Sequence, residues 1–313
     1  MGLSTQMPSS VLNAVDQVVF GKTDIVQCAL AALLARSHVL FEDVPGLAKT
    51  HLVKNLSTVL GLSFHRVQAT PDLLPSDVTG VSIFNPKTAD FEYRPGPVFC
   101  NLLLVDELNR ATPRTQSALL ECMAERQVTA DGWTRALPDP FIVFATQNPI
   151  ESECTFPLPE AQLDRFAMRL QMGYPTEVDE ARILDLADKG SVLARVHAVT
   201  NQEEVQAAIN EVEKVEVHPQ VRAYIVSLVR ATRQHPDVKV GCSPRAGIDL
   251  FRLSRSFAWI NGQSHVDPEA AKFLVPRVFE HRLILKSEAR LRGRTPNSVV
   301  ADVLARIPLP NTR

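Results

Sequence analysis

Apolar residues in the first half of the chain form short continuous runs, and helical stripes lie between these runs. Continuous runs are typical of strands buried on both faces of a sheet, and apolar residues spaced three or four apart are typical of amphipathic helices. The runs predict strands over residues 39–41, 63–68, 102–105, 140–146 and 167–172. The stripes predict helices over residues 9–36, with a break at 18–21, and over 52–60 and 115–126. Strands that alternate with helices predict an α/β fold.

Two segments interrupt this alternation. Residues 81–99 carry β-type residues broken by prolines, and they predict a protruding hairpin or loop. Residues 127–137 contain Asp131-Gly132 between short β-prone runs, which is a strong hairpin signal.

The pattern changes at residues 172–178, and helical stripes dominate from there on. We therefore expect one domain over residues 1–175 and a second, helical domain over residues 176–313. The stripes predict helices over residues 177–189, 202–213, 219–233, 244–261 and 267–290. In the last of these, Arg282, Lys286 and Arg290 would form a basic edge, for which a solvated helix face is the favoured interpretation because no aromatic residue is interleaved.

Polar residues follow the first predicted strand and lead into a helix that begins with Lys49-Thr50. Unpaired backbone N–H groups at a helix start favour an anion, a lysine adds a point charge for phosphates, and a threonine hydroxyl can bind Mg²⁺. The loop departs from the pattern G-x-x-x-x-G-K-S/T because Asp43 and Ala48 stand at its glycine positions. The alternative is an ordinary strand–turn–helix with a solvated lysine. The predicted phosphate-binding residues are Asp43, Val44, Pro45, Gly46, Leu47, Ala48, Lys49 and Thr50.

Two other predicted strands also end in polar residues. Asp106-Glu107 ends the run at 102–105, and Asn148 follows the run at 140–146. Carboxylates would be costly inside a sheet, whereas the carboxyl ends of parallel strands are where ligands bind. The simpler alternatives are a surface carboxylate pair beside Arg110 and a turn cap at Asn148.

Composition sets limits on the class of protein. The chain has 313 residues, of which 45% are hydrophobic and 22% charged, and its formal net charge is −2. This slightly acidic balance gives no electrostatic case for a nucleic-acid or anionic-membrane partner. The five cysteines lack Cys-x-x-Cys spacing, and no apolar run is long enough to span a membrane. We therefore expect a cytoplasmic protein.

With these features in order, the chain resembles the MoxR family of AAA+ ATPases. The matching segments are residues 42–50, 70–77, 103–111, 115–121, 125–128, 144–150, 157–166 and 243–246. The resemblance implies an α/β P-loop AAA+ core, with a parallel five-stranded sheet flanked by helices, and a smaller all-helical lid domain. It also implies ATP and Mg²⁺ as cofactors, and an adenine pocket formed by apolar residues around Gly21.

The resemblance also implies roles for individual residues. Lys49 would hold the β- and γ-phosphates, and Thr50 and Asp106 would hold Mg²⁺. Glu107 would polarise the attacking water, and Asn148 would orient that water. Arg165 would be an arginine finger acting on a neighbouring subunit, although it could simply pair with Asp164 or Glu160. Arg245 would be a sensor arginine at the start of a lid helix, acting in cis or in trans.

The expected assembly is a homo-hexamer that remodels or matures a client protein, or inserts a cofactor or metal, through a partner with a von Willebrand factor A domain. One alternative is a nucleic-acid-dependent motor that uses residues 81–99 and 127–137 as pore loops. Another is a nucleotide-gated scaffold with little hydrolysis, against which Glu107 argues.

Overall fold

The computed structural model describes residues 6–44, 46–148, 155–188 and 196–311. Its centre is a five-stranded sheet in the order β2-β5-β8-β1-β9, in which every pair of neighbours is parallel. The strands are β1 (Val39–Glu42), β2 (Phe64–Gln68), β5 (Leu102–Asp106), β8 (Ile142–Gln147) and β9 (Met168–Leu170). The carboxyl ends of all five strands therefore lie along one edge, and their amino ends lie along the other.

Alternate residues of each central strand face opposite sides of the sheet. Phe41, Leu104 and Phe144 share a buried cluster with α1 (Met7–Asp16), α2 (Thr23–Leu34) and α3 (Lys49–Val59). Their neighbours in the strands, such as Leu103 and Val143, join the cluster that contains α5 (Pro113–Glu125). The sheet is thus covered on both faces, which explains why its strands read as continuous apolar runs.

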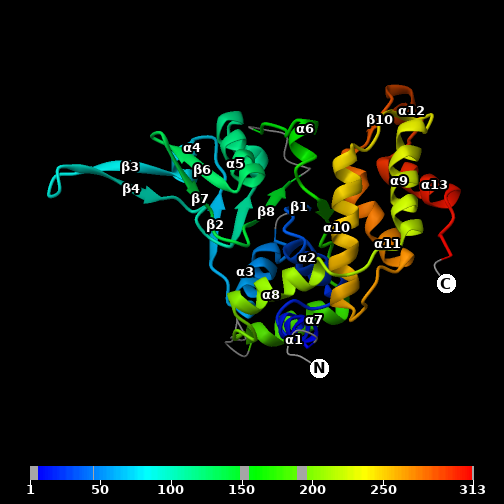
Figure 1. Ribbon diagram of the computed structural model, residues 1–313, viewed down its shortest axis with the longest axis horizontal. Helices are drawn as coiled ribbons and strands as arrows, with labels where there is room; N and C mark the ends of the chain where they lie inside the picture. Colours follow the sequence, from blue (N-terminus) through cyan, green and yellow to red (C-terminus); the bar gives the residue numbers. More distant parts are fainter. Residues whose placement is uncertain (1–5, 45, 149–154, 189–195, 312–313) are drawn as a thin grey trace.

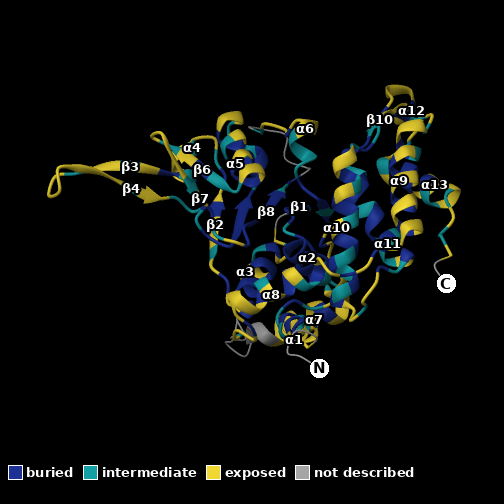
Figure 2. Ribbon diagram, in the orientation of Figure 1, coloured by how far each residue is buried: buried dark blue, intermediate teal, exposed yellow. Residues whose placement is uncertain are grey.

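Two hairpins extend from this core. The first, β3 (Gly80–Asn85) and β4 (Asp90–Pro95), follows the short helix α4 (Pro75–Thr79) and projects away from the body of the molecule (Figure 1). The second pairs β6 (Gln127–Ala130) with β7 (Trp133–Ala136) around the predicted Asp131-Gly132 turn. Figure 2 shows that most of the first hairpin is exposed.

The remainder of the chain is mainly helical. It comprises α6 (Glu160–Leu163) before β9, and then α7 (Glu177–Asp188), α8 (Gln202–Val212), α9 (Pro219–Gln234), α10 (Pro244–Ile260), α11 (Pro268–Phe279), α12 (Ser287–Leu291) and α13 (Pro296–Arg306). Helix α10 packs against α2, α8, α9 and α11. The buried residues of these helices continue the cluster on the α2 face of the sheet.

The predicted helix over residues 267–290 is wrong. Helix α11 ends at Phe279, a 3₁₀ turn covers Glu280–Arg282, and β11 (Ile284–Leu285) pairs with β10 (Val238–Val240) before α12 begins. At this turn the Arg282 side chain points inward and forms a buried ion pair with Asp249 on α10. The predicted basic edge of Arg282, Lys286 and Arg290 is therefore also wrong, since Arg282 is buried and Arg290 belongs to a separate helix.

None of the described helices is both long and apolar enough to cross a membrane.

Candidate functional site

The loop between β1 and α3 forms a tight turn whose amide groups open toward a cavity. Gly46 (φ +84°) and Ala48 (φ 56°) both adopt left-handed conformations, and α3 begins directly afterwards at Lys49. A helix start leaves backbone N–H groups unpaired and carries a partial positive charge. Val44 and Leu47 belong to the same loop, and Thr50 is the second residue of α3. Pro45, which was predicted to contribute, lies outside the described residues.

Lys49 folds over this loop. Its Nζ donates to the backbone oxygens of Val44 at 2.7 Å and Asp43 at 3.3 Å. Burial lowers the pKa of Lys49, while the charges of Asp43, Asp106 and Glu107 oppose that shift. The ammonium group and the strand-end carboxylates therefore lie within one electrostatic environment.

Asp43 stands where the usual loop pattern has its first glycine, and its side chain makes contacts that a glycine could not make. Its carboxylate accepts hydrogen bonds from the backbone N–H groups of Met172 and Gly173, the second at 3.4 Å. These residues follow β9 and lead toward α7. The side chain thus ties the loop to the segment that connects the sheet with the helical part.

The two carboxylates at the end of β5 have different surroundings. Asp106 Oδ2 lies 2.7 Å from Arg66 Nε, and Oδ1 accepts a 3.4 Å contact from Thr146 Oγ1. Glu107 has a left-handed backbone (φ 56°), which turns its carboxylate away from the strand direction. Its Oε2 accepts from Gln68 Nε2 at 2.9 Å and from Arg110 Nη1 at 3.1 Å. Arg36, Ala89, Arg126 and Asp131 have the same left-handed conformation away from this site, so the conformation alone does not mark a functional residue.

One cavity of about 500 Å³ brings most of the predicted site residues together at the carboxyl edge of the sheet. Lys49, Thr50, Asp106, Glu107 and Asn148 all line it. The sequence interpretation missed Arg66, Gln68 and Thr146, which line it too. Arg66 and Gln68 alternate along β2, so their common face was visible in the sequence. What the sequence lacked was the pairing of β2 with β5, which puts Gln68 beside Asp106.

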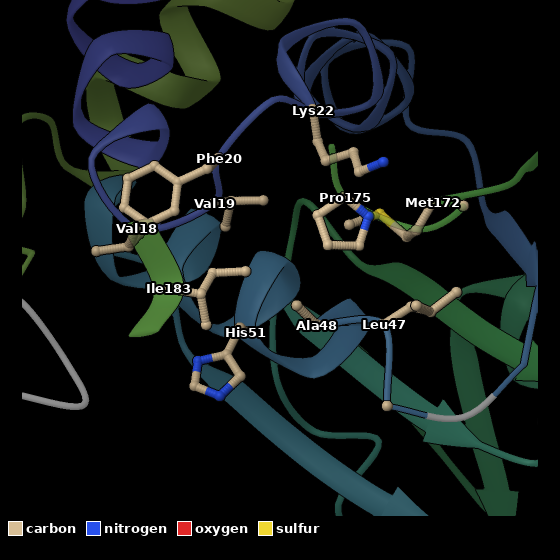
Figure 3. Close-up of a pocket in the computed structure, with 12 residues that line it drawn as sticks. Val18, Val19, Phe20, Lys22, Leu47, Ala48, His51, Met172, Pro175 and Ile183 are labelled. Carbon is tan, nitrogen blue, oxygen red and sulfur yellow. The ribbon is translucent and has the colours of Figure 1, made fainter. Parts of the chain in front are cut away.

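A second, more apolar cavity of about 240 Å³ adjoins the first and shares Gly46, Leu47, Ala48 and His51 with it. Figure 3 shows Val18, Val19 and Phe20, from the turn after α1, facing Ile183 of α7 across this space. The predicted apolar residues around Gly21 therefore lie next to the loop. A planar apolar group in the second cavity could extend a charged group into the first.

The donors in the larger cavity fit a magnesium ion that is bound together with phosphates. Among the residues that the structure describes, no group of three or more His, Cys, Asp or Glu side chains could hold a metal ion alone. Mg²⁺ needs only one or two protein oxygens when substrate phosphates and water complete its shell. Thr50 and Asp106 can supply these oxygens.

Arg165 and Arg245 do not line either cavity. Arg165 lies on the turn before β9, where Ala167 N donates to His38 O at the amino end of β1. Arg245 lies in the first turn of α10, and its charge acts on buried His38. Both arginines therefore lie toward the amino edge of the sheet, opposite the edge that carries Lys49.

Comparison with known proteins gives the same fold over almost the entire chain. Residues 38–168 match the model of the ATPase family associated with various cellular activities (AAA), and residues 230–303 match the AAA lid domain. The chain is 46% identical to YeaC of Bacillus subtilis, over 96% of this chain and 93% of that one. It is 38% identical to chaperone MoxR1 of Mycobacterium tuberculosis, over 95% and 80% of the two chains. A crystal structure of a protein from Cytophaga hutchinsonii superposes with a TM-score of 0.92 at 36% identity, covering 98% of this chain and 96% of that one.

Proposed function

This chain belongs to the MoxR family of AAA+ ATPases, and on that premise we propose that it hydrolyses ATP to remodel client proteins. One observation carries the proposal: Lys49, Thr50, Asp106, Glu107 and Asn148 surround one cavity that adjoins an apolar pocket. This arrangement suits a nucleoside triphosphate, whose base is apolar and whose phosphates are charged. The AAA fold and the chaperone relative support the same activity.

Each residue has a role that follows from its position. The adenine occupies the pocket of Val19, Phe20 and Ile183, and the phosphates lie on the amide groups at the start of α3. Lys49 exchanges its bonds to the loop carbonyls for bonds to the β- and γ-phosphates. Thr50 and Asp106 would hold Mg²⁺, which would neutralise phosphate charge when bound.

Glu107 accepts a proton from the attacking water as general base, and Asn148 orients that water. Gln68 and Arg110 hold the Glu107 carboxylate in place through its Oε2 atom. In this proposal the second carboxylate oxygen, Oε1, contacts the water. Arg66 holds the Asp106 carboxylate in place in the same way, through its Oδ2 atom.

Arg165 and Arg245 complete the site of a neighbouring subunit in this proposal. They lie at the sheet edge opposite Lys49, so they suit an assembly in which the edges of successive copies meet. Such a head-to-tail contact closes into a ring when the rotation between copies is right, and we propose a homo-hexamer. An arginine finger of this kind contributes about 10³ to 10⁵ in rate in other nucleotide hydrolases.

The client is proposed to be a protein that needs maturation or insertion of a cofactor or metal, reached through a partner with a von Willebrand factor A domain. The β3–β4 hairpin supports a protein client because Phe84 and Phe91 are exposed and contact each other at a ring-centroid distance of 5.5 Å. It carries Lys87 and Arg94 but also Asp90 and Glu92, so it offers no basic surface for nucleic acid.

A mixing experiment tests hydrolysis and the action in trans together. Glu107→Gln subunits keep the finger but lose the base, and Arg165→Ala subunits keep the base but lose the finger. We expect each variant alone to bind ATP and release phosphate at least about 10²-fold more slowly than wild type. Mixed assemblies should recover Mg²⁺-dependent phosphate release, in proportion to the number of sites where an intact Arg165 meets an intact Glu107 of the neighbouring subunit.

The matched controls are Glu121→Gln and Arg114→Ala, which change exposed residues of α5 and should leave turnover unchanged. No recovery on mixing would overturn the action in trans. Unchanged turnover in the Glu107→Gln variant would overturn the proposed base.

A further inference from the structure

A groove between α9 and α10 combines an apolar floor with exposed apolar walls. Ile225, Val229 and Phe251 line its floor, and its cavity measures about 780 Å³. Helices α9 and α10 are in contact along the groove, since a Cβ on Gly247 would lie at van der Waals distance, 3.4 Å, from Val229 Cγ2. Val226 and Ile248 form the walls and are 56% and 50% exposed. An apolar groove of this kind is a candidate contact surface.

The rim of the groove is strongly basic. Arg222, Arg230, Arg233 and Arg252 line it, and no carboxylate is among the residues that do so. None of these four arginines forms an ion pair within the part of the chain that the structure describes. Burial and the nearby charge of Arg222 lower the pKa of Arg255, which stacks on Phe251. The groove therefore suits an apolar segment that carries negative charge.

Helix α7 of this same chain has the complementary surface. Val178 and Leu184 are 64% and 70% exposed, and with exposed Ala181 they form one stripe at three-residue spacing. Exposed Glu177, Glu180 and Asp185 lie near the stripe, and the one exposed cation among the described side chains of α7, Arg182, lies 3.5 Å from the Asp179 carboxylate. Asp179 of α7 lies against Gly21 in the turn after α1, whereas α9 packs on α10 and, in Figure 1, lies on the side of α10 away from α7. The two surfaces therefore belong to different faces of the molecule.

We infer that α7 of one copy docks into the α9–α10 groove of a neighbouring copy, an inference that rests on the proposed ATPase function. Because the two surfaces differ, the contact is head-to-tail and allows a ring rather than a closed two-fold dimer. The acidic flanks of α7 meet the arginine rim, and Val178 and Leu184 enter the apolar floor.

Each of the two surfaces in this contact lies next to a residue that has a proposed role at a nucleotide site. Helix α7 also carries Ile183, which lines the pocket proposed for adenine. The groove includes Pro244, the residue before Arg245. Docking therefore brings the sensor arginine of one copy toward the nucleotide end of the next. Nucleotide bound against Ile183 and docking of α7 are therefore coupled, so that each favours the other.

Charge reversal with rescue tests the contact. One variant carries Arg230→Glu and Arg233→Glu, a second carries Glu177→Arg and Glu180→Arg, and a third carries all four changes. Sedimentation velocity with ATP, in a Glu107→Gln background, measures assembly at several protein concentrations. We expect each double reversal to weaken assembly at least about tenfold and the combined variant to recover most of it.

A second arm tests the apolar part without relying on charge. Val178→Asp and Ile248→Asp change exposed residues, so the subunits should fold normally and still bind ATP, while assembly weakens. Leu291→Asp is the matched control, because Leu291 is 89% exposed and lies outside both surfaces.

The outcomes separate this inference from the proposed function. Wild-type rings that hydrolyse ATP, with assembly unaffected by the changes in α7 or the groove, would overturn the contact alone. Weakened assembly that the combined variant does not restore would also overturn it, as would a wild-type protein that stays monomeric with ATP. A wild-type protein that releases no phosphate would overturn the proposed function.

Discussion

Arg282 Nε lies 3.0 Å from Asp164 Oδ1, and this ion pair fastens the helical part of the chain to the turn that carries Arg165. The same guanidinium donates through Nη2 to the backbone oxygens of Asp164 at 3.1 Å and Phe166 at 3.0 Å. It also pairs with Asp249 of α10. One buried side chain thus holds the backbone on both sides of Arg165.

Asp164 connects this turn to the second arginine as well. Ser243 Oγ donates to both carboxylate oxygens of Asp164, at 3.1 and 2.9 Å. Ser243 precedes Pro244-Arg245 at the start of α10. The turn that carries Arg165 and the start of α10 that carries Arg245 are therefore bonded to each other, so that movement of α10 would move both arginines together.

We predict that Arg282→Met strongly destabilises the protein. The change leaves two carboxylates without their cation in a site where the arginine side chain is 2% exposed. Loss of one partner from a buried pair costs about 3–5 kcal/mol in the free energy of unfolding. Urea denaturation measures this loss.

The matched control is Arg290→Met, because Arg290 is exposed on α12. Its free energy of unfolding should stay within about 0.5 kcal/mol of wild type. Equal stability of the two variants would show that the Arg282 ion pairs contribute nothing.

We predict that Asp43→Gly weakens ATP binding even though it restores the usual glycine. The substitution removes the carboxylate that accepts from Met172 and Gly173, which line the apolar pocket. Loss of a hydrogen bond to a charged group costs about 1.5–3 kcal/mol, and we expect affinity to fall at least about tenfold. Titration with a fluorescent ATP analogue measures the effect. Tighter binding would show that a glycine at this position matters more than the hydrogen bonds from Met172 and Gly173 to the Asp43 carboxylate.

The sheet and the cavity could be predicted from the sequence because both depend on local pattern. Apolar runs such as 102–105 lie in strands buried on both faces, and polar residues that end parallel strands must meet at one edge. That reasoning brought Lys49, Asp106 and Asn148 together without any knowledge of strand order. The Asp131-Gly132 hairpin was likewise set by its own turn residues.

Features that depend on long-range pairing could not be predicted in this way. The helical stripe over 267–290 gives no sign that Arg282 turns inward, because its partners Asp164 and Asp249 are distant in sequence. The role of Asp43 was hidden for the same reason, since Met172 is 129 residues away. Periodicity reports which face of an element is buried, but not which charged group is buried against it.

We predict that Gly21→Ala weakens ATP binding by displacing α7 from the apolar pocket. A Cβ on Gly21 would lie 2.1 Å from Asp179 Oδ2, so the Asp179 side chain, α7 or the turn after α1 must shift. Ile183 of α7 lines the pocket and would move with it.

The matched control for this variant is Gly132→Ala. Gly132 also has a positive φ, but nothing lies within 4 Å of a Cβ there. Both variants carry the cost of an alanine at positive φ, about 1 kcal/mol, and only the first should lose affinity for ATP. Equal affinities would show that the close approach of Asp179 does not shape the pocket.

We predict that His38→Gln flattens the pH dependence of stability in the acid range. His38 is buried at the amino end of β1, where Nδ1 accepts from Val143 N at 3.0 Å and Nε2 donates to Met123 O at 3.1 Å. The pKa of this imidazole is lowered from 6.5 to about 4, chiefly by burial; the bond to Met123 opposes this shift, and the charges of Arg126 and Arg245 act in the same direction as burial. The native protein therefore keeps His38 neutral at pH values where the unfolded chain is protonated.

The sign of the effect follows from proton binding. Between about pH 4 and pH 6.5 the unfolded state binds the extra proton, so the free energy of unfolding rises with pH, by up to about 1.4 kcal/mol per pH unit from this residue. Glutamine can accept from Val143 and donate to Met123 but does not titrate. Buried His281, whose pKa is also lowered, contributes with the same sign in both proteins, so the difference between them isolates His38. Urea denaturation from pH 4 to pH 8 should give curves that diverge below about pH 6.5, and parallel curves would mean that His38 is protonated in the native state.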